Sequence, residues 1–157
     1  MNIDIISVGK IKEKFFRDAI DEYLKRLSAF AKVNIIEIKD EKIPDNASAL
    51  QCEKIKEIEG KKILSALKDG KTVALCIEGK LHSSEDIADF MLKTANSSSR
   101  KSFVIGGSLG LSDEVKAKAD LKMSVGKITL PHQLMRVVLL EQIYRGFKIN
   151  NNQSYHK

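Results

Sequence analysis

The feature that most constrains the fold is a regular alternation of short apolar segments with longer segments of helical periodicity. The apolar segments predict strands at residues 2–8, 32–38, 71–79 and 101–107, with a short fifth strand opening residues 121–130. The helical pattern covers residues 11–30, 49–70, 83–99, 112–120 and 131–149. Because a parallel neighbour is reached only through a crossover, this order predicts an α/β protein with a mainly parallel sheet and helices on both faces. The 157 residues fit one domain, 1–157.

The last predicted helix is apolar almost all the way round. Pro131 stands at its expected first position, and the apolar residues are Leu134, Met135, Val137, Val138, Leu139, Leu140, Ile143, Tyr144 and Phe147. One face can meet the sheet, and the others need a further partner, for which a second copy of the chain is the simplest choice. Glu141 and Arg145 lie four residues apart, so they can pair across an interface, line a site or be purely structural.

Basic residues are concentrated at the C-terminal end. The chain carries a formal charge of +6, and residues 121–157 hold six basic residues against one acid, Glu141. The six are Lys122, Lys127, Arg136, Arg145, Lys148 and Lys157. Such an end is expected to face a phosphate-bearing partner. A basic surface without a partner is the alternative.

Membrane, secreted and metal-binding classes are disfavoured. No apolar run approaches the length of about 18 residues that a membrane span needs, and the chain's start lacks the features of a signal peptide. Cys52 and Cys76 are isolated, which speaks against a redox motif and favours a reducing, cytoplasmic location. Neither an H-E-x-x-H motif nor a cluster of Asp, Glu and His occurs, so no metal is expected.

The glycine-bearing stretch "VIGGSLGLS" (residues 104–112) follows a predicted strand and precedes a helix, the place where α/β proteins bind ligands. Its G-G-x-x-G spacing does not match a dinucleotide fingerprint, and "GKIT" at 126–129 does not complete a P-loop. By itself the stretch is as well explained by a structural turn as by a ligand loop.

Three histidines are candidates for proton transfer near neutral pH. His82 precedes a predicted helix and is expected at the surface. His132 lies in the first turn of the last helix, where the positive end of the helix dipole opposes protonation. His156 lies in the basic C-terminal segment.

Three segments occur together near the end of the chain: "VIGGSLGLS", "SVGKITLPHQLMRVVLLEQIYRGFKI" and the terminal "YHK". In this order, together with the opening "ISVGKIKEKFFRDAIDEYLKRL", they closely resemble the RlmH family. The resemblance extends over essentially the whole chain, and "LPHQLMRVVLLEQIYR" is its most specific part. RlmH proteins are bacterial methyltransferases of the SPOUT superfamily that act on large-subunit ribosomal RNA.

The resemblance implies a C-terminal trefoil knot, a homodimer and S-adenosylmethionine as cofactor, held by three loops. Carried over residue by residue, the cofactor-binding positions are Leu75, Gly106, Val125, Gly126, Lys127, Ile128, Thr129 and Leu130. Leu109 departs from the polar residue typical of the family, so its side chain is not expected to contact the cofactor. Ser154 replaces a frequent proline, which implies a less rigid tail.

The substrate implied by the resemblance is a pseudouridine in the helix 69 loop of 23S rRNA, methylated at N3 on assembled 70S ribosomes. His156 is then the candidate base or positioning residue, and Tyr155 is placed to stack on or hydrogen-bond the target base. Arg145 is assigned to offset the developing charge, and Arg136, Lys148 and Lys157 to hold RNA. The segment "NNNQS" has little to bury, so the tail is expected to be loosely held until RNA binds.

Two other classes remain open. A non-catalytic ribosome-binding protein would use the same basic end without needing a cofactor. A hydrolase or dehydrogenase on a doubly wound sheet is disfavoured, because the chain lacks a nucleotide fingerprint and a nucleophile–base motif.

Overall fold

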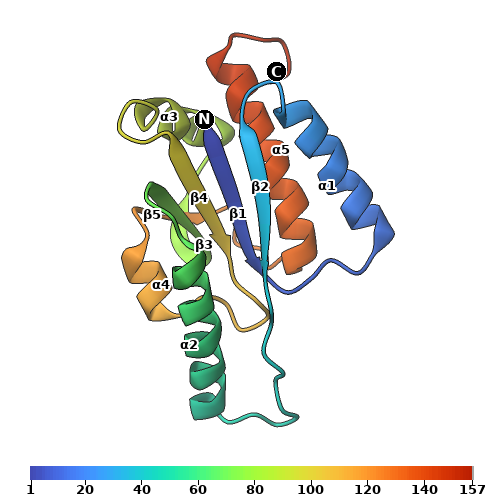
Figure 1. Cartoon of the computed structure of the whole chain (residues 1–157), viewed down its shortest axis with the longest axis vertical. Coiled ribbons are helices and arrows are strands. Elements are labelled where there is room, and N and C mark those ends of the chain that lie inside the picture. Colours follow the sequence, from blue (N-terminus) through green and yellow to red (C-terminus); the bar gives the residue numbers. More distant parts are fainter. Residues whose placement is uncertain (157) are drawn as a thin grey trace.

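The computed structural model describes residues 1–156 and shows an α/β fold (Figure 1). Within these residues the strands are β1 (Asn2–Val8), β2 (Lys32–Ile38), β3 (Lys71–Leu81), β4 (Arg100–Ile105) and β5 (Leu121–Ser124). The helices are α1 (Lys14–Leu27), α2 (Ala49–Ala66), α3 (Ser84–Lys93), α4 (Asp113–Lys118) and α5 (His132–Asn150). Each predicted strand and helix is present, and the differences are at the element ends, apart from a bulge inside β3.

The strands form one sheet in the order β2-β1-β4-β3-β5, and every pairing between neighbours is parallel. The predicted parallel sheet is therefore confirmed. From β1 the chain moves to β2 at one edge, whereas from β4 it moves to β5 at the other edge. Since β1 and β4 are neighbours, their carboxyl ends form the switch point at which open parallel sheets bind ligands.

Two apolar cores cover the two faces of the sheet, as the prediction of helices on both faces requires. The larger core joins the sheet to α1, α3 and α5, through residues such as Leu27, Met91 and Leu140. The smaller core joins the other face to α2 and α4, through Ile63 and Val115. All five of these side chains are at most 1% exposed.

The apolar residues around helix α5 are explained largely by three neighbours within one chain: the sheet, α1 and α3. The helix packs on the sheet and lies between α1 and α3. The ring of Tyr144 meets Tyr23 of α1 edge to face at 6.4 Å, and Gly146 lies against Ala88 and Met91 of α3. Helices α1 and α3 thus cover part of the apolar surface of α5. From the sequence, that surface was assigned to a second copy of the chain. A half-buried stripe, Leu134, Val138, Glu141 and Arg145, remains on the outer side of α5.

The ends of two helices differ from the predicted ranges for identifiable reasons. Pro131 lies just before α5 rather than at its first helical position, with φ −54° and ψ 140°. Helix α3 ends at Lys93 instead of near residue 99, because the chain turns at Thr94, whose hydroxyl donates to the Phe90 carbonyl at 2.6 Å. Ser112, the first residue of the helical range predicted from the sequence, caps α4 by accepting a hydrogen bond from the Val115 amide.

Lys101 on β4 is a buried cation and gives a first testable prediction. Its side chain is 0% exposed, and Nζ donates to the Ser98 carbonyl at 3.2 Å. Burial lowers the pKa of Lys101. Because one neutral acceptor does not offset lost hydration, Lys101→Met is expected to raise stability by roughly 1 kcal/mol. For a chain of this size that is about 2–4 °C in Tm.

The pH dependence of this gain checks its origin. A lysine with a lowered folded pKa destabilises the fold fully below that pKa, and the effect disappears as pH rises through the unfolded value of about 10.4. The gain from Lys101→Met should therefore be largest near neutral pH and shrink toward pH 10. Lys118→Met, at an exposed position on α4, is the control and should change Tm little. A lower Tm for Lys101→Met would contradict this account.

Candidate functional site

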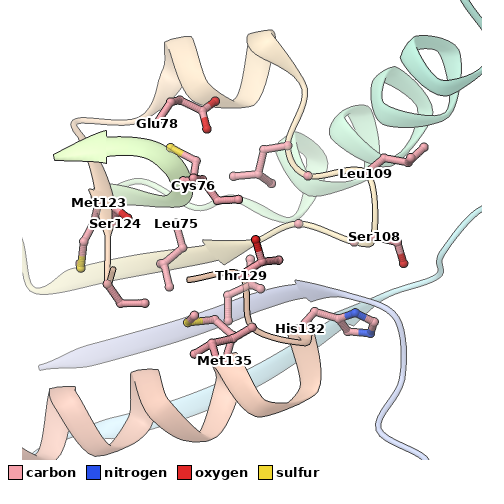
Figure 2. Close-up of a pocket in the computed structure, with 18 of the residues that line it drawn as sticks. Leu75, Cys76, Glu78, Ser108, Leu109, Met123, Ser124, Thr129, His132 and Met135 are labelled. Atoms are coloured by element: carbon pink, nitrogen blue, oxygen red, sulfur yellow. The ribbon is translucent and has the colours of Figure 1, made fainter. Parts of the chain in front are cut away.

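A cavity of about 780 Å³ opens at the carboxyl ends of β3, β4 and β5 and against the start of α5 (Figure 2). Three loops form most of its wall: residues 75–78 at the end of the regular part of β3, residues 105–111 after β4, and the segment from β5 into α5. This volume falls within the range of about 300–1,000 Å³ for small-molecule and cofactor sites. The cavity lies beyond the carboxyl ends of the strands, where open parallel sheets bind ligands.

The structure brings together seven of the eight positions that the resemblance assigned to the cofactor. Residues that line the cavity include Leu75, Gly106, Val125, Gly126, Ile128, Thr129 and Leu130. Figure 2 shows Leu75 and Thr129 with Met123 and Met135 around the same space. Lys127 is exposed and is not part of the lining. The eight assignments as cofactor ligands stay predictions.

Strand β3 creates part of this cavity by leaving the sheet. Leu75 and Lys80 both pair with Met123 of β5, so residues 76–79 bulge out between them. Cys76, Ile77 and Glu78 thereby reach the cavity wall. At Gly79 an added Cβ would lie 2.7–2.8 Å from backbone atoms of Lys122 and Met123, so only glycine fits where the two strands meet again. The sequence predicted a plain strand here and missed the bulge.

The glycine stretch after β4 proves to be both a turn and a cavity wall. The Gly110 amide donates to the Gly107 carbonyl at 3.0 Å, which closes the turn. An added Cβ at Gly106 would lie 2.6 Å from the Gly110 carbonyl carbon, so the turn closes tightly over this residue. Because side chains are small or absent there, backbone groups are close to whatever occupies the cavity.

The mouth of the cavity carries an ion-pair network. Lys116 of α4 donates from Nζ to Glu78 at 2.8 Å and lies 2.9 Å from Asp113. These hydrogen bonds, to Asp113 first and then Glu78, raise the pKa of Lys116, and the bond from Lys116 lowers the pKa of Glu78. Burial raises the pKa of the Cys76 thiol on the adjacent wall. The cavity therefore has an apolar floor and a charged rim, a pattern the sequence did not reveal.

His132 at the start of α5 is a further lining residue that the sequence did not select for the site. Burial, with the nearby Arg136 cation as the second cause, lowers its pKa. The expected effect of the helix dipole has the same sign, so His132 is held in its neutral form near pH 7.

A second, smaller cavity of about 210 Å³ adjoins the first. It shares Gly107, Ser108, Leu109 and His132 with the large cavity and continues toward the ends of β1 and β2. The buried Glu59 lines it and accepts from the Glu41 amide at 2.9 Å. That bond shows what Glu59 does within the chain: it fixes the loop after β2.

The C-terminal tail is docked on the protein rather than loosely held, contrary to the expectation from its composition. The ring of Tyr155 meets Tyr144 edge to face at 5.0 Å, and the Arg145 guanidinium lies 4.7 Å from the Tyr155 centroid. The Tyr155 hydroxyl donates to Glu141 at 3.3 Å. His156 bonds Glu85 of α3 through Nε2 at 2.6 Å and faces Arg145 through Nδ1 at 3.3 Å.

Within one chain, the tail and the cavity are separate. Tyr155 and His156 contact α5 between Glu141 and Arg145, whereas the cavity touches its start, as far as Met135. At 1.5 Å per residue the separation along the helix is roughly 9–15 Å. Neither tail residue lines the cavity.

Arg145 forms the ion pair with Glu141 that the helical spacing allowed, with Nη2 at 2.6 Å and Nε at 3.0 Å from Oε1. This bond to Glu141 raises the pKa of Arg145. Lys148 lies half-buried one turn further on, with Nζ 5.7 Å from the Tyr144 ring. Lys157, a predicted RNA-binding residue, lies outside the described residues.

The prediction that Arg136 holds RNA is wrong. Its side chain is 0% exposed and binds inside the protein. Nη1 donates to Glu37 at 2.8 Å, and Nη2 donates to the carbonyls of Val8 at 3.2 Å and Gly9 at 2.6 Å. Arg136 thus ties the start of α5 to the carboxyl ends of β1 and β2. Net charge along the sequence cannot separate such an internal tie from a surface cation.

Residues 1–156 contain neither a metal-binding cluster nor a membrane-spanning helix. These residues bring together no group of three or more His, Cys, Asp and Glu side chains able to hold a metal ion. Across the same range, no helix has both the length and the apolar character needed to cross a membrane.

Comparison with known proteins decides the family. A family model described as "Predicted SPOUT methyltransferase" matches residues 1–156. The chain belongs to the SPOUT methyltransferase family. The predicted relationship to large-subunit ribosomal RNA methyltransferases is confirmed at the same time, because curated proteins of that name are similar over the full length of both chains.

Among these relatives, "Ribosomal RNA large subunit methyltransferase H" from Bifidobacterium animalis subsp. lactis is 55% identical over 159 aligned residues, covering 100% of each chain. The proteins of the same name from Lactobacillus acidophilus and Clostridioides difficile are 55% and 53% identical, again with full coverage. A solved structure, "The structure of a probable methylase family protein from Haemophilus influenzae Rd KW20", superimposes with a TM-score of 0.55 at 10% identity. It covers 96% of this chain and 66% of that one, and supports the fold alone.

Membership in the SPOUT methyltransferase family indicates what kind of ligand to expect in the cavity, which the shape of the cavity alone does not. A SPOUT methyltransferase needs a site for a methyl donor next to a site for its substrate, which by name is large-subunit ribosomal RNA in these relatives. The large cavity has the volume for a donor. The trefoil knot that the resemblance implies is a family expectation and stays a prediction for this SPOUT chain.

Proposed function

We propose that the protein transfers a methyl group from S-adenosylmethionine to N3 of a pseudouridine in the helix 69 loop of 23S rRNA, on assembled 70S ribosomes in the cytoplasm. The observation that carries the proposal is the 780 Å³ cavity, lined by seven positions assigned to the cofactor, in a chain of this family. The full-length similarity to large-subunit rRNA methyltransferases supports the substrate class.

The residues of the cavity fit S-adenosylmethionine. Apolar side chains, including Leu75, Met123 and Met135, offer a surface for the adenine ring, and the tight turn at Gly106 offers backbone groups for polar edges. When bound, S-adenosylmethionine supplies an electrophilic methyl group on a sulfonium. The protein's task is then to hold the acceptor nitrogen in line with that methyl group, because alignment contributes much of the acceleration.

A second chain is proposed to complete the site. Within one chain, Tyr155 and His156 do not reach the cavity. The half-buried outer stripe of α5 runs from the apolar Leu134 and Val138 to the paired Glu141 and Arg145. If two copies pair through this stripe in antiparallel orientation, the tail of one chain meets the cavity end of the other. The arrangement is a homodimer with two shared sites.

The tail residues are proposed to act on the target base. Methylation at N3 forms a nitrogen–carbon bond, breaks the carbon–sulfur bond and releases the imide proton from N3. Tyr155 can stack on the base, and Arg145 can offset the negative charge that grows as the proton leaves. Both ring nitrogens of His156 are engaged, by Glu85 and Arg145. That arrangement favours His156 as a positioning residue over a free base.

Gly106→Ala tests the cavity as the cofactor site. The added methyl would meet the Gly110 backbone at 2.6 Å, so the turn must open. Overpacking of this kind costs about 1–3 kcal/mol, and a loss of binding free energy of that size corresponds to about 5- to 150-fold in affinity for S-adenosylmethionine. Calorimetry with the cofactor measures it. Gly146→Ala is the matched control, because Gly146 lies in α5 outside the cavity lining and the closest contact of its added Cβ would be the flexible Met91 side chain, at 3.3 Å, so cofactor binding should stay at the wild-type level. Equal affinities for all three proteins would place the cofactor elsewhere.

The reaction itself is tested by mass spectrometry of 23S rRNA from cells lacking the protein, followed by incubation of those ribosomes with purified protein and S-adenosylmethionine. We expect a methyl group to be missing from the helix 69 pseudouridine and restored on incubation. Cofactor binding without methylation of any rRNA position would reject the proposed substrate. Ribosome binding without cofactor binding would favour a non-catalytic ribosome-binding protein.

A further inference from the structure

Phe15 is an exposed aromatic ring at the entrance to α1. It is 65% exposed, and it is the one aromatic side chain among the large exposed hydrophobic residues of the described chain. Its neighbour Phe16 turns inward and packs on the larger core, with the two rings 4.4 Å apart. Folding therefore uses Phe16 and leaves Phe15 in water, where an apolar ring has no stabilising role.

Unpaired cations surround this ring in the sequence. Lys10, Lys12 and Arg17 are all exposed, and within residues 1–156 none of the three forms a side-chain hydrogen bond or ion pair. The adjacent Lys14, in contrast, is paired with Asp18 at 2.6 Å. We refer to Lys10, Lys12, Phe15 and Arg17 as the entry patch.

The entry patch works against the stability of the helix it begins. The N-terminus of a helix favours anions and side-chain caps. Helices α3 and α4 follow this rule, with Ser83 and Ser112 as caps and two acids in each first turn. The first turn of α1 has no acid, and Glu13 at its cap position makes no capping bond. Cations at positions where they lower the stability of the helix indicate that they serve binding or another function instead of folding.

The position of the entry patch relates it to the cavity. It follows β1 directly, at the carboxyl edge of the sheet, and Figure 1 shows the β1–α1 connection at the end of the sheet where α5 begins. Gly9, next to the patch, lies so close to His132 that an added Cβ would be 3.1 Å from Nε2. His132 in turn lines both cavities. Val8 and Gly9 line the smaller cavity together with His132, so the patch borders the smaller cavity, which adjoins the large one.

We propose that the entry patch is an RNA-docking surface. Lys10, Lys12 and Arg17 bind backbone phosphates, and Phe15 stacks on an unpaired base of the rRNA loop beside the reacting nucleotide. An exposed aromatic ring among cations is the combination that single-stranded nucleic acid recognises, because the ring accepts any base face and the cations follow the backbone. This inference rests on the proposed rRNA substrate and extends it to contacts away from the reacting base.

The test compares ribosome affinity at several salt concentrations. The patch variant is Lys10→Ala/Lys12→Ala/Arg17→Ala, and the matched control is Lys54→Ala/Lys61→Ala/Lys68→Ala, which removes three exposed lysines on and after α2. Each phosphate contact adds about 0.7–0.9 to the logarithmic salt slope. We expect the patch variant to reduce the slope by about 2 and the control to change it little. Affinity for S-adenosylmethionine should stay at the wild-type value in both variants.

Phe15→Ala and Phe15→Tyr separate stacking from charge. If Phe15 stacks on a base, Phe15→Ala should lower the ribosome affinity roughly tenfold, and Phe15→Tyr, which keeps an aromatic ring, should keep the wild-type affinity. Equal losses in the patch and control variants, or an unchanged affinity in Phe15→Ala, would overturn the proposal while leaving the proposed function intact. So would patch variants that sediment as monomers, because the surface would then belong to a dimer contact. If the wild-type protein fails to bind ribosomes, the proposed function falls, and this inference with it.

Discussion

Removing Tyr155 to Lys157 is expected to abolish methylation of ribosomes while the fold and the affinity for S-adenosylmethionine stay intact. The described part of this segment lies on the surface of α5 and α3 and touches neither core. Its loss exposes one face of Tyr144 and leaves the cavity wall unchanged. If the tail orients the target base or assists loss of its proton, turnover should fall by about 10²–10⁴-fold.

Single substitutions grade this effect. His156→Ala should retain cofactor binding and lose most turnover, and Glu85→Gln should show a smaller loss of kcat, because the amide can still hold the Nε2 group of His156. Ser154→Ala, at an exposed residue just before the tail contacts, is the matched control and should behave as wild type. Wild-type turnover in His156→Ala would remove this residue from the mechanism.

Mixing two impaired proteins, at an S-adenosylmethionine concentration too low to fill the Gly106→Ala cavity, tests whether the tail acts across the dimer. Chains lacking Tyr155–Lys157 keep their cavity, and Gly106→Ala chains keep their tail but bind the cofactor weakly. In a mixed dimer with a shared site, one intact cavity meets one intact tail, so activity should return to a fraction of the wild-type level. No recovery, with mixed dimers verified by sedimentation, would place the tail and cavity of the same chain together.

Arg136→Met is expected to destabilise the fold strongly. The guanidinium is 0% exposed and bonds Glu37 and the carbonyls of Val8 and Gly9. Methionine fills a similar volume but satisfies none of these acceptors. Breaking a buried ion pair costs about 3–5 kcal/mol, and the low end applies because Glu37 is 33% exposed and can regain water. Since domains are stable by only about 5–15 kcal/mol, a large part of the fold's stability would be lost.

Urea unfolding measures this prediction, with the slope m compared between variants to confirm that the unfolding transition is unchanged. Arg26→Met is the matched control, because Arg26 pairs with Glu22 at 2.8 Å on the surface of α1 with 42% of its side chain exposed. That variant should unfold near the wild-type midpoint. Equal midpoints for Arg136→Met and the wild type would show that the buried network contributes no net stability.

The fold was predictable because each strand is short and apolar and each helix carries its own signals. Residues 71–79 contain a nearly continuous apolar run, which is typical of strands covered on both faces. The ranges predicted for α3 and α4 begin at Ser83 and Ser112, and both serines cap their helices in the structure. The bulge of β3 left no such mark, because "CIEG" can continue a strand as readily as leave it, and the sheet decides only when β5 pairs with both sides of the bulge.

Site positions predicted from sequence motifs meet in the structure, whereas the RNA-binding role predicted for Arg136 from charge alone was wrong. The three cofactor loops came from the resemblance, and seven of their eight positions meet in one cavity. Arg136 was taken for a surface cation because burial cannot be read from charge. The tail was taken as loose because "NNNQS" is polar, whereas one aromatic side chain, Tyr155, holds it against Tyr144 and Arg145. The partners of Arg136 lie 99 to 128 residues away in the sequence, so its burial depends on the folded topology.

The tie between Arg136 and the end of β1 also bears on how the chain is made. Residues 8 and 136 are separated by nearly the whole length of the protein, yet the carbonyl of one accepts a hydrogen bond from the side chain of the other. A nascent chain can form β1, α1 and β2 early, but one sheet face waits for α5, which supplies Leu139, Leu140 and Ile143 to the larger core. Long-range closure of this kind slows folding and leaves apolar surface exposed during synthesis. Helix α5 therefore completes the core in the same step as it completes the wall of the cavity.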